Sequence, residues 1–301
     1  MEPFARHYFQ LAFRVKFYDA RGDEFQKLFG RIMNLRFPGD FVQTRPWGRL
    51  GDNKCDGYLP SARKFYQCYG PDEMTQSRTL EKLNDDFEGA LPFAGRFFDT
   101  WVFVHNSRDG RLPAWLVLDL QARRVAHPEL RIETFGYEEM LREVLALDQG
   151  ALVDLLGPFP SQTDFLSLRF EDLRPILTHI ATVAVPADIA VRPVPTAKLE
   201  YNRLGDDARQ LLLAGMRKAA LVRSYLDRQP DKDLAARVSG AFHRMYEDYK
   251  QTSSDPDTIF HRLQVAVQGP FTQQSKQIVA ALAVLAYLFE ECDIFERPPE
   301  T

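Results

Sequence analysis

The chain has 301 residues, enough for two domains, and its 45% hydrophobic and 27% charged residues are typical of a folded globular protein. This composition excludes a disordered or collagen-like chain, and no apolar run reaches the roughly 20 residues of a bilayer-spanning helix. Because the N-terminus also lacks the basic and then apolar pattern of a signal peptide, we predict a cytoplasmic protein without a membrane partner. The three cysteines form no CxxC pair, which predicts free thiols.

The formal net charge of −4 is unevenly distributed. Residues 1–135 hold 20 basic and 18 acidic side chains, a net charge of +2, whereas residues 136–301 hold 18 and 24, a net charge of −6. Proteins that bind DNA tightly by themselves usually carry a much stronger basic surface, since their affinity comes largely from phosphate neutralisation. If this protein acts on DNA, we expect a partner to deliver the DNA.

The first elements follow from hydrophobic spacing. Residues 4–18 mix aromatic and basic side chains without a clear period, and their secondary structure stays open. Apolar side chains at helical spacing then predict an amphipathic helix over residues 23–35; they are Phe25, Leu28, Phe29, Ile32 and Met33. A short strand at Phe41-Val42 is expected to follow.

A β-hairpin is predicted next, because extended segments 54–59 and 64–69 flank a polar turn at Ser61-Ala62. If the turn is tight, facing residue numbers sum to 123, and Asp56 lies opposite Gln67 with Cβ atoms about 4.5–5.5 Å apart. Two such side-chain oxygens suit a hard cation such as Mg²⁺ or Mn²⁺. The alternative is that Asp56-Gly57 only marks a turn, since this dipeptide is a common turn signal.

Alternating helices and strands are predicted after the hairpin. We expect helices at about 75–90, 137–147, 151–156 and 170–182, and strands at 100–106, 115–120 and 128–135. They predict a central mixed sheet flanked by helices. His105 and Asn106 close a central strand, either as site residues or as a capped strand end. The absence of HExxH, GxSxG and GxxxxGK[ST] disfavours a zinc protease, a serine hydrolase and a P-loop ATPase.

The C-terminal part is predicted to be all helical. Pro186, Pro193 and Pro195 predict a linker, which divides the chain into an N-terminal domain at 1–185, a linker at 186–197 and a helical dimerisation or docking domain at 198–301. Helices are expected at 206–228, 232–251, 257–267 and 271–292. The run 278–289 is apolar nearly all round, which predicts either the centre of a bundle or an interface between subunits.

The pairs Asp56-Gly57 and Gln67-Cys68-Tyr69 resemble the PD-(D/E)XK nuclease superfamily, in particular its Mrr-like branch, in which Asp-Gly precedes Gln-Cys-Lys. The expected order of helix, strand, strand, strand is also that of this family. The resemblance implies an α/β restriction-endonuclease-like domain in which Asp56 and Gln67 hold the metal ion and a lysine helps to activate water. Tyr69 stands where the family has that lysine.

Other residues are candidates for the rest of this site. Lys82 lies on the helix after the strand, where a lysine replaces the missing one in some relatives, so the predicted catalytic set is Asp56, Gln67 and Lys82. Lys64 is a poorer substitute, because strand alternation places it on the face opposite Gln67. Glu24 on the first helix is either a further carboxylate or a solvated helix residue. Further candidates near the hairpin are Asp52 and Tyr69.

The segment 289–299, together with Ile259-Phe260 and residues 246–249, resembles the C-terminal module of ABC three-component defence systems, also called Lamassu-like. The resemblance covers roughly residues 198–299. It implies an effector that this helical module docks, through a middle subunit, onto an SMC-like or Rad50-like ABC ATPase. The two resemblances together imply a metal-dependent DNA endonuclease effector. The alternative is a catalytically degenerate nuclease-fold subunit for DNA binding or assembly, because Tyr69 replaces the lysine and Gln67 carries no charge.

Overall fold

The computed structural model describes residues 1–44, 55–107, 110–183, 198–271, 274–291 and 295. The chain divides into two compact units: an α/β unit of residues 13–155, and a helical unit of residues 1–12 and 156–301. The first helix, α1 (Pro3–Asp19), covers the segment whose structure the sequence leaves open, and it begins in the helical unit and ends in the α/β unit. The predicted linker at 186–197 lies outside the described residues.

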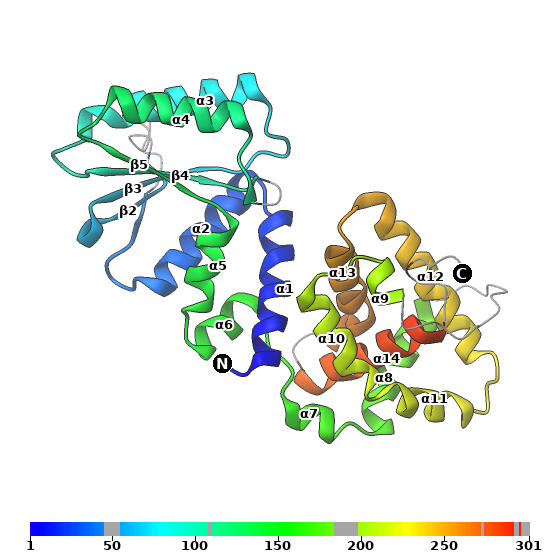
Figure 1. Ribbon diagram of the computed structural model, residues 1–301. Helices are drawn as coiled ribbons and strands as arrows, with labels where there is room; N and C mark the ends of the chain where they lie inside the picture. Colours follow the sequence, from blue (N-terminus) through cyan, green and yellow to red (C-terminus); the bar gives the residue numbers. More distant parts are fainter. Residues whose placement is uncertain (45–54, 108–109, 184–197, 272–273, 292–294, 296–301) are drawn as a thin grey trace. The chain divides into compact units, whose positions relative to one another are not determined.

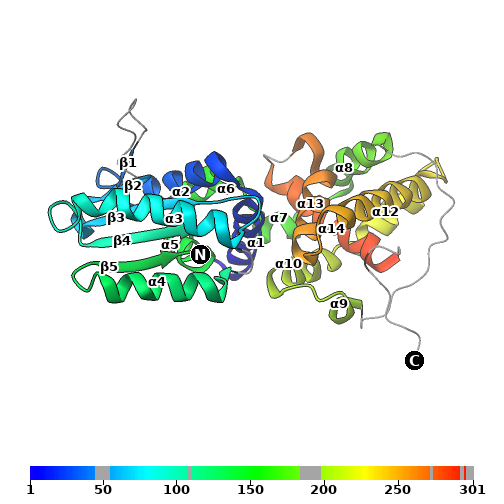
Figure 2. The same cartoon turned by 90° about the horizontal axis from the view of Figure 1, so that it is seen from above.

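The α/β unit is built on a five-stranded mixed sheet in the order β1 to β5 (Figure 2). The first three strands pair antiparallel, and β3, β4 and β5 pair parallel. This arrangement confirms the predicted mixed sheet. The strands are β1 (Val42–Gln43), β2 (Gly57–Leu59), β3 (Lys64–Tyr69), β4 (Thr100–His105) and β5 (Arg131–Phe135).

Helices cover both faces of this sheet (Figure 1). On one face lie α2 (Gly22–Arg36) and α5 (Tyr137–Leu145), and on the other lie α3 (Gln76–Ala90) and α4 (Ala114–Ala126). The five apolar residues that predict α2 are all buried, so that prediction is confirmed. Strand alternation sends Tyr66 toward α2, where its ring centroid lies 5.3 Å from that of Phe29. Phe65 instead joins the core beneath α3 and α4.

The segment 115–120, predicted as a strand, is part of helix α4, so this prediction is wrong. Leu116 and Leu120, four residues apart, face the core, as in a helix. The side chains between them point elsewhere, and Leu118 is 70% exposed. An apolar residue on the outward side of a helix produces the continuous apolar run that is typical of a buried strand.

The helical unit contains the helices that follow α6 (Gln149–Leu156). The helix predicted at 206–228 is two helices, separated at Arg217-Lys218. The other predicted helices are present with ends shifted by a few residues. In chain order the helices are α7 (Gln162–Leu166), α8 (Phe170–Val183), α9 (Lys198–Tyr201), α10 (Asp206–Met216), α11 (Ala219–Asp227), α12 (Leu234–Thr252), α13 (Pro256–Gln268) and α14 (Ser275–Glu291).

The last helix, α14, is the centre of this bundle and contacts α7, α8, α10, α11 and α13. All side chains from Ile278 to Phe289 are buried. Gly215 on α10 allows a close approach to α14, because a Cβ atom there would lie 2.3 Å from the carbonyl oxygen of Leu282. The apolar run is therefore covered within its own unit, as the bundle interpretation predicts. It no longer supports self-association through the C-terminal helices, which stays a prediction.

Candidate functional site

The hairpin of β2 and β3 has the predicted register. Gly57 pairs with Tyr66 and Leu59 with Lys64, so facing numbers sum to 123. A single 3-10 turn at Pro60–Ala62 connects the strands and ends at Arg63, whose left-handed φ of 49° reverses the chain. One residue before β2, the Asp56 amide donates a hydrogen bond of 2.8 Å to the Tyr66 carbonyl. The pairing therefore continues beyond the strand and brings Asp56 to the level of Gln67.

The Asp56 carboxylate is buried, with 6% exposure. Its Oδ2 accepts a 2.7 Å hydrogen bond from the backbone N–H of Cys68, and its Oδ1 accepts one of 2.5 Å from the side-chain amide of Gln26. Gln26 lies on α2 at the border of the buried stripe, next to Phe25. Helix α2 and strand β3 thus fix the orientation of this carboxylate. The sequence did not predict Gln26 as a partner of Asp56. The one sequence feature that pointed to it is its position next to the buried apolar residues of α2.

Gln67 lies on the sheet face toward α3, since strand alternation places it with Phe65 and Tyr69, which pack in that core. The residue is 4% exposed, and its Oε1 atom has no hydrogen-bond partner within the described residues. A buried amide oxygen without a partner costs about 1–3 kcal/mol. Such an atom is a position at which a bound water or cation restores the lost interaction.

Tyr69 does not supply the charge of the missing lysine. Its ring centroid lies 6.2 Å from that of Phe103, and its hydroxyl accepts a 3.4 Å hydrogen bond from Thr79 on α3. Lys82, also on α3, forms an ion pair with Asp86, which is 2% exposed. Among the described residues, the Lys82 ammonium bonds this carboxylate and not the Asp56 or Gln67 side chain.

The remaining candidates lie apart from this pair. Glu24 is 72% exposed and pairs with Lys27 at 2.6 Å, as expected of a solvated helix residue. Lys64 pairs with Glu133 at 2.5 Å, on the sheet face opposite Gln67, as strand alternation predicts. Asp52 lies outside the residues that the structure describes.

The two hairpin cysteines act as small apolar groups. Burial raises the pKa of the Cys55 thiol strongly, and the Cys55 Sγ donates a 3.1 Å hydrogen bond to the Gly57 carbonyl. Burial, with a smaller effect of Asp56, also raises the pKa of Cys68 well above its usual value. A thiol with a raised pKa is a poor nucleophile and a poor metal ligand at neutral pH, so the chemistry at this hairpin belongs to oxygen atoms.

At the end of β4, His105 and Asn106 hold loops together. The Nδ1 atom of His105 accepts a 3.3 Å hydrogen bond from the Ser107 amide, and burial lowers the pKa of His105 to about 4. A Cβ atom at Gly136 would lie 2.6 Å from this imidazole, so only glycine fits there. The Asn106 amide donates hydrogen bonds to two backbone carbonyls, of Ala20 at 3.2 Å and of Pro71 at 3.3 Å. These contacts match the strand-end alternative.

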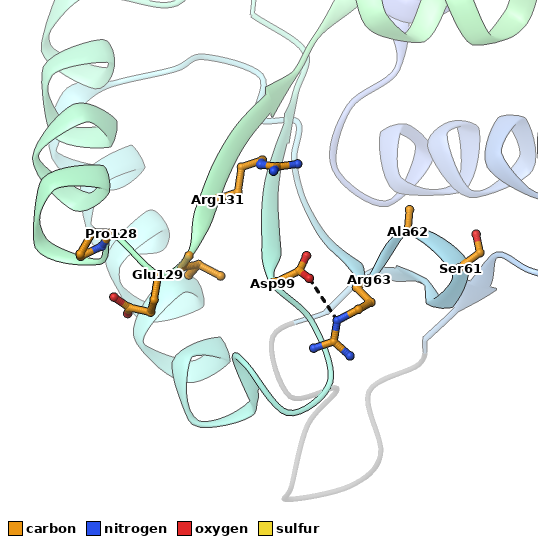
Figure 3. A pocket seen from close by; sticks show the side chains of 8 residues that line it. Ser61, Ala62, Arg63, Asp99, Pro128, Glu129 and Arg131 are labelled. Atoms are coloured by element: carbon orange, nitrogen blue, oxygen red, sulfur yellow. Dashed lines mark hydrogen bonds and ion pairs between the residues drawn. The ribbon is translucent and has the colours of Figure 1, made fainter.

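A polar pocket of about 680 Å³ lies at the opposite end of the sheet, where β4 and β5 begin (Figure 3). The Arg63 guanidinium donates a 3.1 Å hydrogen bond to Asp99 at its wall. Arg131 and Glu129 also line it, so its charges balance. About four residues along β3, at roughly 3.3 Å each, separate its wall at Arg63 from Gln67, and the pocket is not part of the hairpin site.

The donor set at the hairpin is small. Within the described parts of the chain, no group of three or more His, Cys, Asp or Glu side chains converges as a metal site. Asp56 offers the carboxylate, and Gln67 the buried oxygen without a partner. Within the described residues no hydrogen bond joins the two side chains, since Asp56 is bonded from α2 and Gln67 faces α3. The chemistry of their oxygen atoms suits a hard cation with few protein ligands and several waters, such as Mg²⁺, better than zinc, which prefers nitrogen and sulfur.

Comparison with known proteins identifies the C-terminal part of the chain. Residues 171–296 match the family model of C-terminal domain 10 of the ABC-three component (ABC-3C) systems. The match begins in α8, upstream of the predicted boundary at Lys198, and lies entirely within the helical unit. No curated protein and no solved structure matches the chain.

Two further findings bear on partners. In the described part of the chain, no helix combines the length and the apolar character needed to cross a bilayer. Membership in an ABC-3C system implies partner subunits that include an ABC ATPase. Since residues 171–296 have the sequence of a C-terminal domain of this type, the protein is a component of an ABC-3C defence system.

Proposed function

We propose that the α/β unit is the effector of this system and that it hydrolyses DNA phosphodiester bonds with Mg²⁺ or Mn²⁺ at the hairpin site. The observation that carries the proposal is the buried Oε1 atom of Gln67, which has no hydrogen-bond partner within the described residues and lies at the same level of the hairpin as Asp56. The resemblance of Asp56-Gly57 and Gln67-Cys68 to the Mrr-like nucleases supports the same assignment.

Asp56 and Gln67 would hold the cation. Each carboxylate oxygen of Asp56 accepts a hydrogen bond within the chain, and a carboxylate offers about four lone-pair sites in all. When bound, the ion supplies Lewis-acid catalysis and a water of lowered pKa. Gln26 and the Cys68 amide act as positioning groups that hold the Asp56 carboxylate in one orientation.

Lys82 would supply positive charge to the phosphate. Its side chain is 43% exposed, so it is accessible from solvent, while Asp86 restrains it from the buried side. A phosphate that approaches the hairpin would compete with Asp86 for the ammonium group. Tyr69 has no part in this assignment, because it packs in the core.

We infer that the helical unit docks the effector, through a middle subunit, onto an SMC-like or Rad50-like ATPase. The match over residues 171–296 supports this docking role. The net charge of −6 in residues 136–301 gives the chain little affinity of its own for DNA. Delivery of DNA by the assembled complex agrees with this charge distribution.

The second candidate function is a nuclease-fold subunit without activity, kept for DNA binding or assembly. Two observations favour it: both Asp56 oxygens already accept hydrogen bonds from the chain, and Tyr69 occupies the place of the lysine. In this case the Asp56 carboxylate is a structural link between α2 and β3.

Asp56→Asn separates the two candidates. The amide has the same shape, and after rotation of the Gln26 amide it keeps both hydrogen bonds, so the fold is expected to survive while the charge is lost. We expect Mg²⁺- or Mn²⁺-dependent DNA cleavage by the assembled complex to fall at least about 10²-fold, and Lys82→Ala to lower it by about 10²–10³-fold. Asp99→Asn in the distant pocket is the matched control and should cleave like wild type. Undiminished cleavage by the Asp56→Asn complex would exclude this site, and no metal-dependent cleavage by the wild-type complex would favour the second candidate.

A further inference from the structure

Helix α4 carries an apolar surface that faces solvent. Val117 is 46%, Leu118 70% and Val125 72% exposed. We call the exposed side of this helix the α4 outer face; it consists of Ala114, Val117, Leu118, Gln121, Ala122 and Val125. It contains no charged residue, although the solvent side of a helix is normally polar. Three large exposed apolar side chains on one helix are typical of a surface that a partner covers.

We propose that a second copy of this chain covers the α4 outer face, with the two α4 helices packed antiparallel about a two-fold axis. Apart from Ala114, the face together with the exposed Ala126 is symmetric about the point between Gln121 and Ala122, because Val117 corresponds to Ala126 and Leu118 to Val125. Antiparallel packing therefore places Leu118 of one copy opposite Val125 of the other, and Gln121 opposite Ala122. A two-fold contact uses the same patch on both copies and requires this self-complementarity. The small Ala122 near the axis lets the helices approach closely.

The charges at the two ends of α4 favour the same orientation. Arg111 is exposed just before the helix, and the side chain of Glu129, just after it, is 71% exposed. Antiparallel packing brings Arg111 of each copy to the end at which Glu129 of the other copy lies. A parallel arrangement would bring like charges together, which costs free energy. The Arg111–Glu129 pair and the apolar pattern thus favour the antiparallel geometry.

The size of the face sets the strength of the contact. A 13-residue helix is about 20 Å long at 1.5 Å per residue, so its outer face buries a few hundred Å² per copy, below the roughly 800 Å² of a stable interface. The isolated chain is therefore expected to dimerise weakly, with a Kd of about 10⁻⁵–10⁻⁴ M. Two copies held in one assembly would make the contact at a much higher effective concentration.

Sedimentation velocity of the full chain, from about 1 to 300 μM, tests the proposal. Wild type should shift from monomer toward dimer over this range, whereas the double variant Leu118→Asp, Val125→Asp should stay monomeric with an unchanged circular dichroism spectrum. Leu166→Asp on α7 is the matched control, since Leu166 is 74% exposed but lies on another helix. It should associate like wild type.

A charge exchange tests the orientation. Arg111→Glu should weaken dimerisation about 10-fold or more, and adding Glu129→Arg should restore it, because the exchanged pair again carries opposite charges. Ala122→Cys near the axis should form a covalent dimer with a short bismaleimide. Wild type, with its native cysteines, and Glu88→Cys, exposed on α3, give the background.

Three results of these association experiments would overturn the proposal, and one result from the assembled complex would do so as well. The three are a wild-type chain that is monomeric at every concentration, an apolar double variant that still dimerises, and an exchanged charge pair that fails to restore association. Capture of a different subunit by the α4 outer face, shown by loss of that subunit from the complex of the double variant, would assign the face to another partner and would also overturn it. None of these outcomes depends on nuclease activity.

Discussion

Helices α4 and α14 are both apolar on more than one side, and they differ in what covers them. Five helices of its own unit surround α14, so its side chains from Ile278 to Phe289 are all buried. Helix α4 packs on the sheet through Leu116 and Leu120, and its other apolar side faces solvent. An apolar run therefore predicts that a segment needs cover, but it does not say whether the same chain supplies that cover.

The largest difference is expected when a charge enters α14. Leu285 is 1% exposed, and Leu285→Asp would bury a carboxylate without a partner, so we expect a loss of about 4–5 kcal/mol or more, enough to unfold the helical unit. All three tryptophans lie between residues 13 and 155, so their fluorescence reports on the α/β unit, whereas circular dichroism reports on both units. The variant should lose helical signal and keep a cooperative transition in tryptophan fluorescence. A fully folded variant with intact helical signal would contradict the central position of α14.

Truncation of a buried α14 side chain to alanine should destabilise the helical unit less than a buried charge does. Leu282 is fully buried against α10, and Leu282→Ala should cost about 2–5 kcal/mol of the free energy of unfolding of the helical unit, because it leaves a cavity. Val125→Ala on α4 should cost less than about 0.5 kcal/mol in the monomer. Urea unfolding followed by circular dichroism compares the two. Equal losses would show that the two helices are equally covered.

Acid should destabilise the α/β unit through His105. Burial lowers the folded-state pKa of His105 to about 4, against about 6.5 in the unfolded chain. The unfolded state therefore binds the proton more readily, and the contribution of the neutral imidazole is complete above pH 6.5 and decreases as the pH falls toward 4, by up to roughly 3 kcal/mol. Urea unfolding followed by tryptophan fluorescence at pH 7 and pH 4.5 measures this. His105→Gln should have a shallower dependence on pH, and an unchanged dependence would show that His105 does not cause it.

The smallest change in stability is expected for a charge introduced on the exposed side of α4. Leu118→Asp places the new charge in water, so the free energy of unfolding of the monomer should change by no more than about 0.5 kcal/mol. Thermal unfolding at low protein concentration, where dimers are absent, measures this change. A loss as large as that of Leu285→Asp would mean that the same chain covers Leu118 after all.

Local patterns predicted the parts of the fold that depend on near neighbours. The turn at Ser61-Ala62 fixes the pairing of β2 with β3, so the positions of Asp56 and Gln67 followed from counting residues. The stripe from Phe25 to Met33 predicted α2 because one side of that helix is buried and the other is polar.

The missed features depend on residues distant in the sequence. The hairpin sequence does not predict the hydrogen bond from Gln26 of α2 to the Asp56 carboxylate, because 30 residues separate the two. The pocket beside Arg63 requires the register of β3, β4 and β5, which parallel pairing sets across long connections. The segment 115–120 was predicted as a strand because exposed apolar residues lie between the buried ones, so the segment lacks the alternation of apolar and polar residues expected of a surface helix.

Binding of Mn²⁺ to the purified full chain, measured by electron paramagnetic resonance, tests the hairpin metal site most directly. Wild type is expected to bind one Mn²⁺ per chain, with competition by excess Mg²⁺. Asp56→Asn should lose this binding, because Asp56 is the carboxylate of the proposed site, whereas Asp99→Asn should bind like wild type. Equal binding of Mn²⁺ by wild type and Asp56→Asn would contradict the assignment of Asp56 and Gln67 as metal ligands.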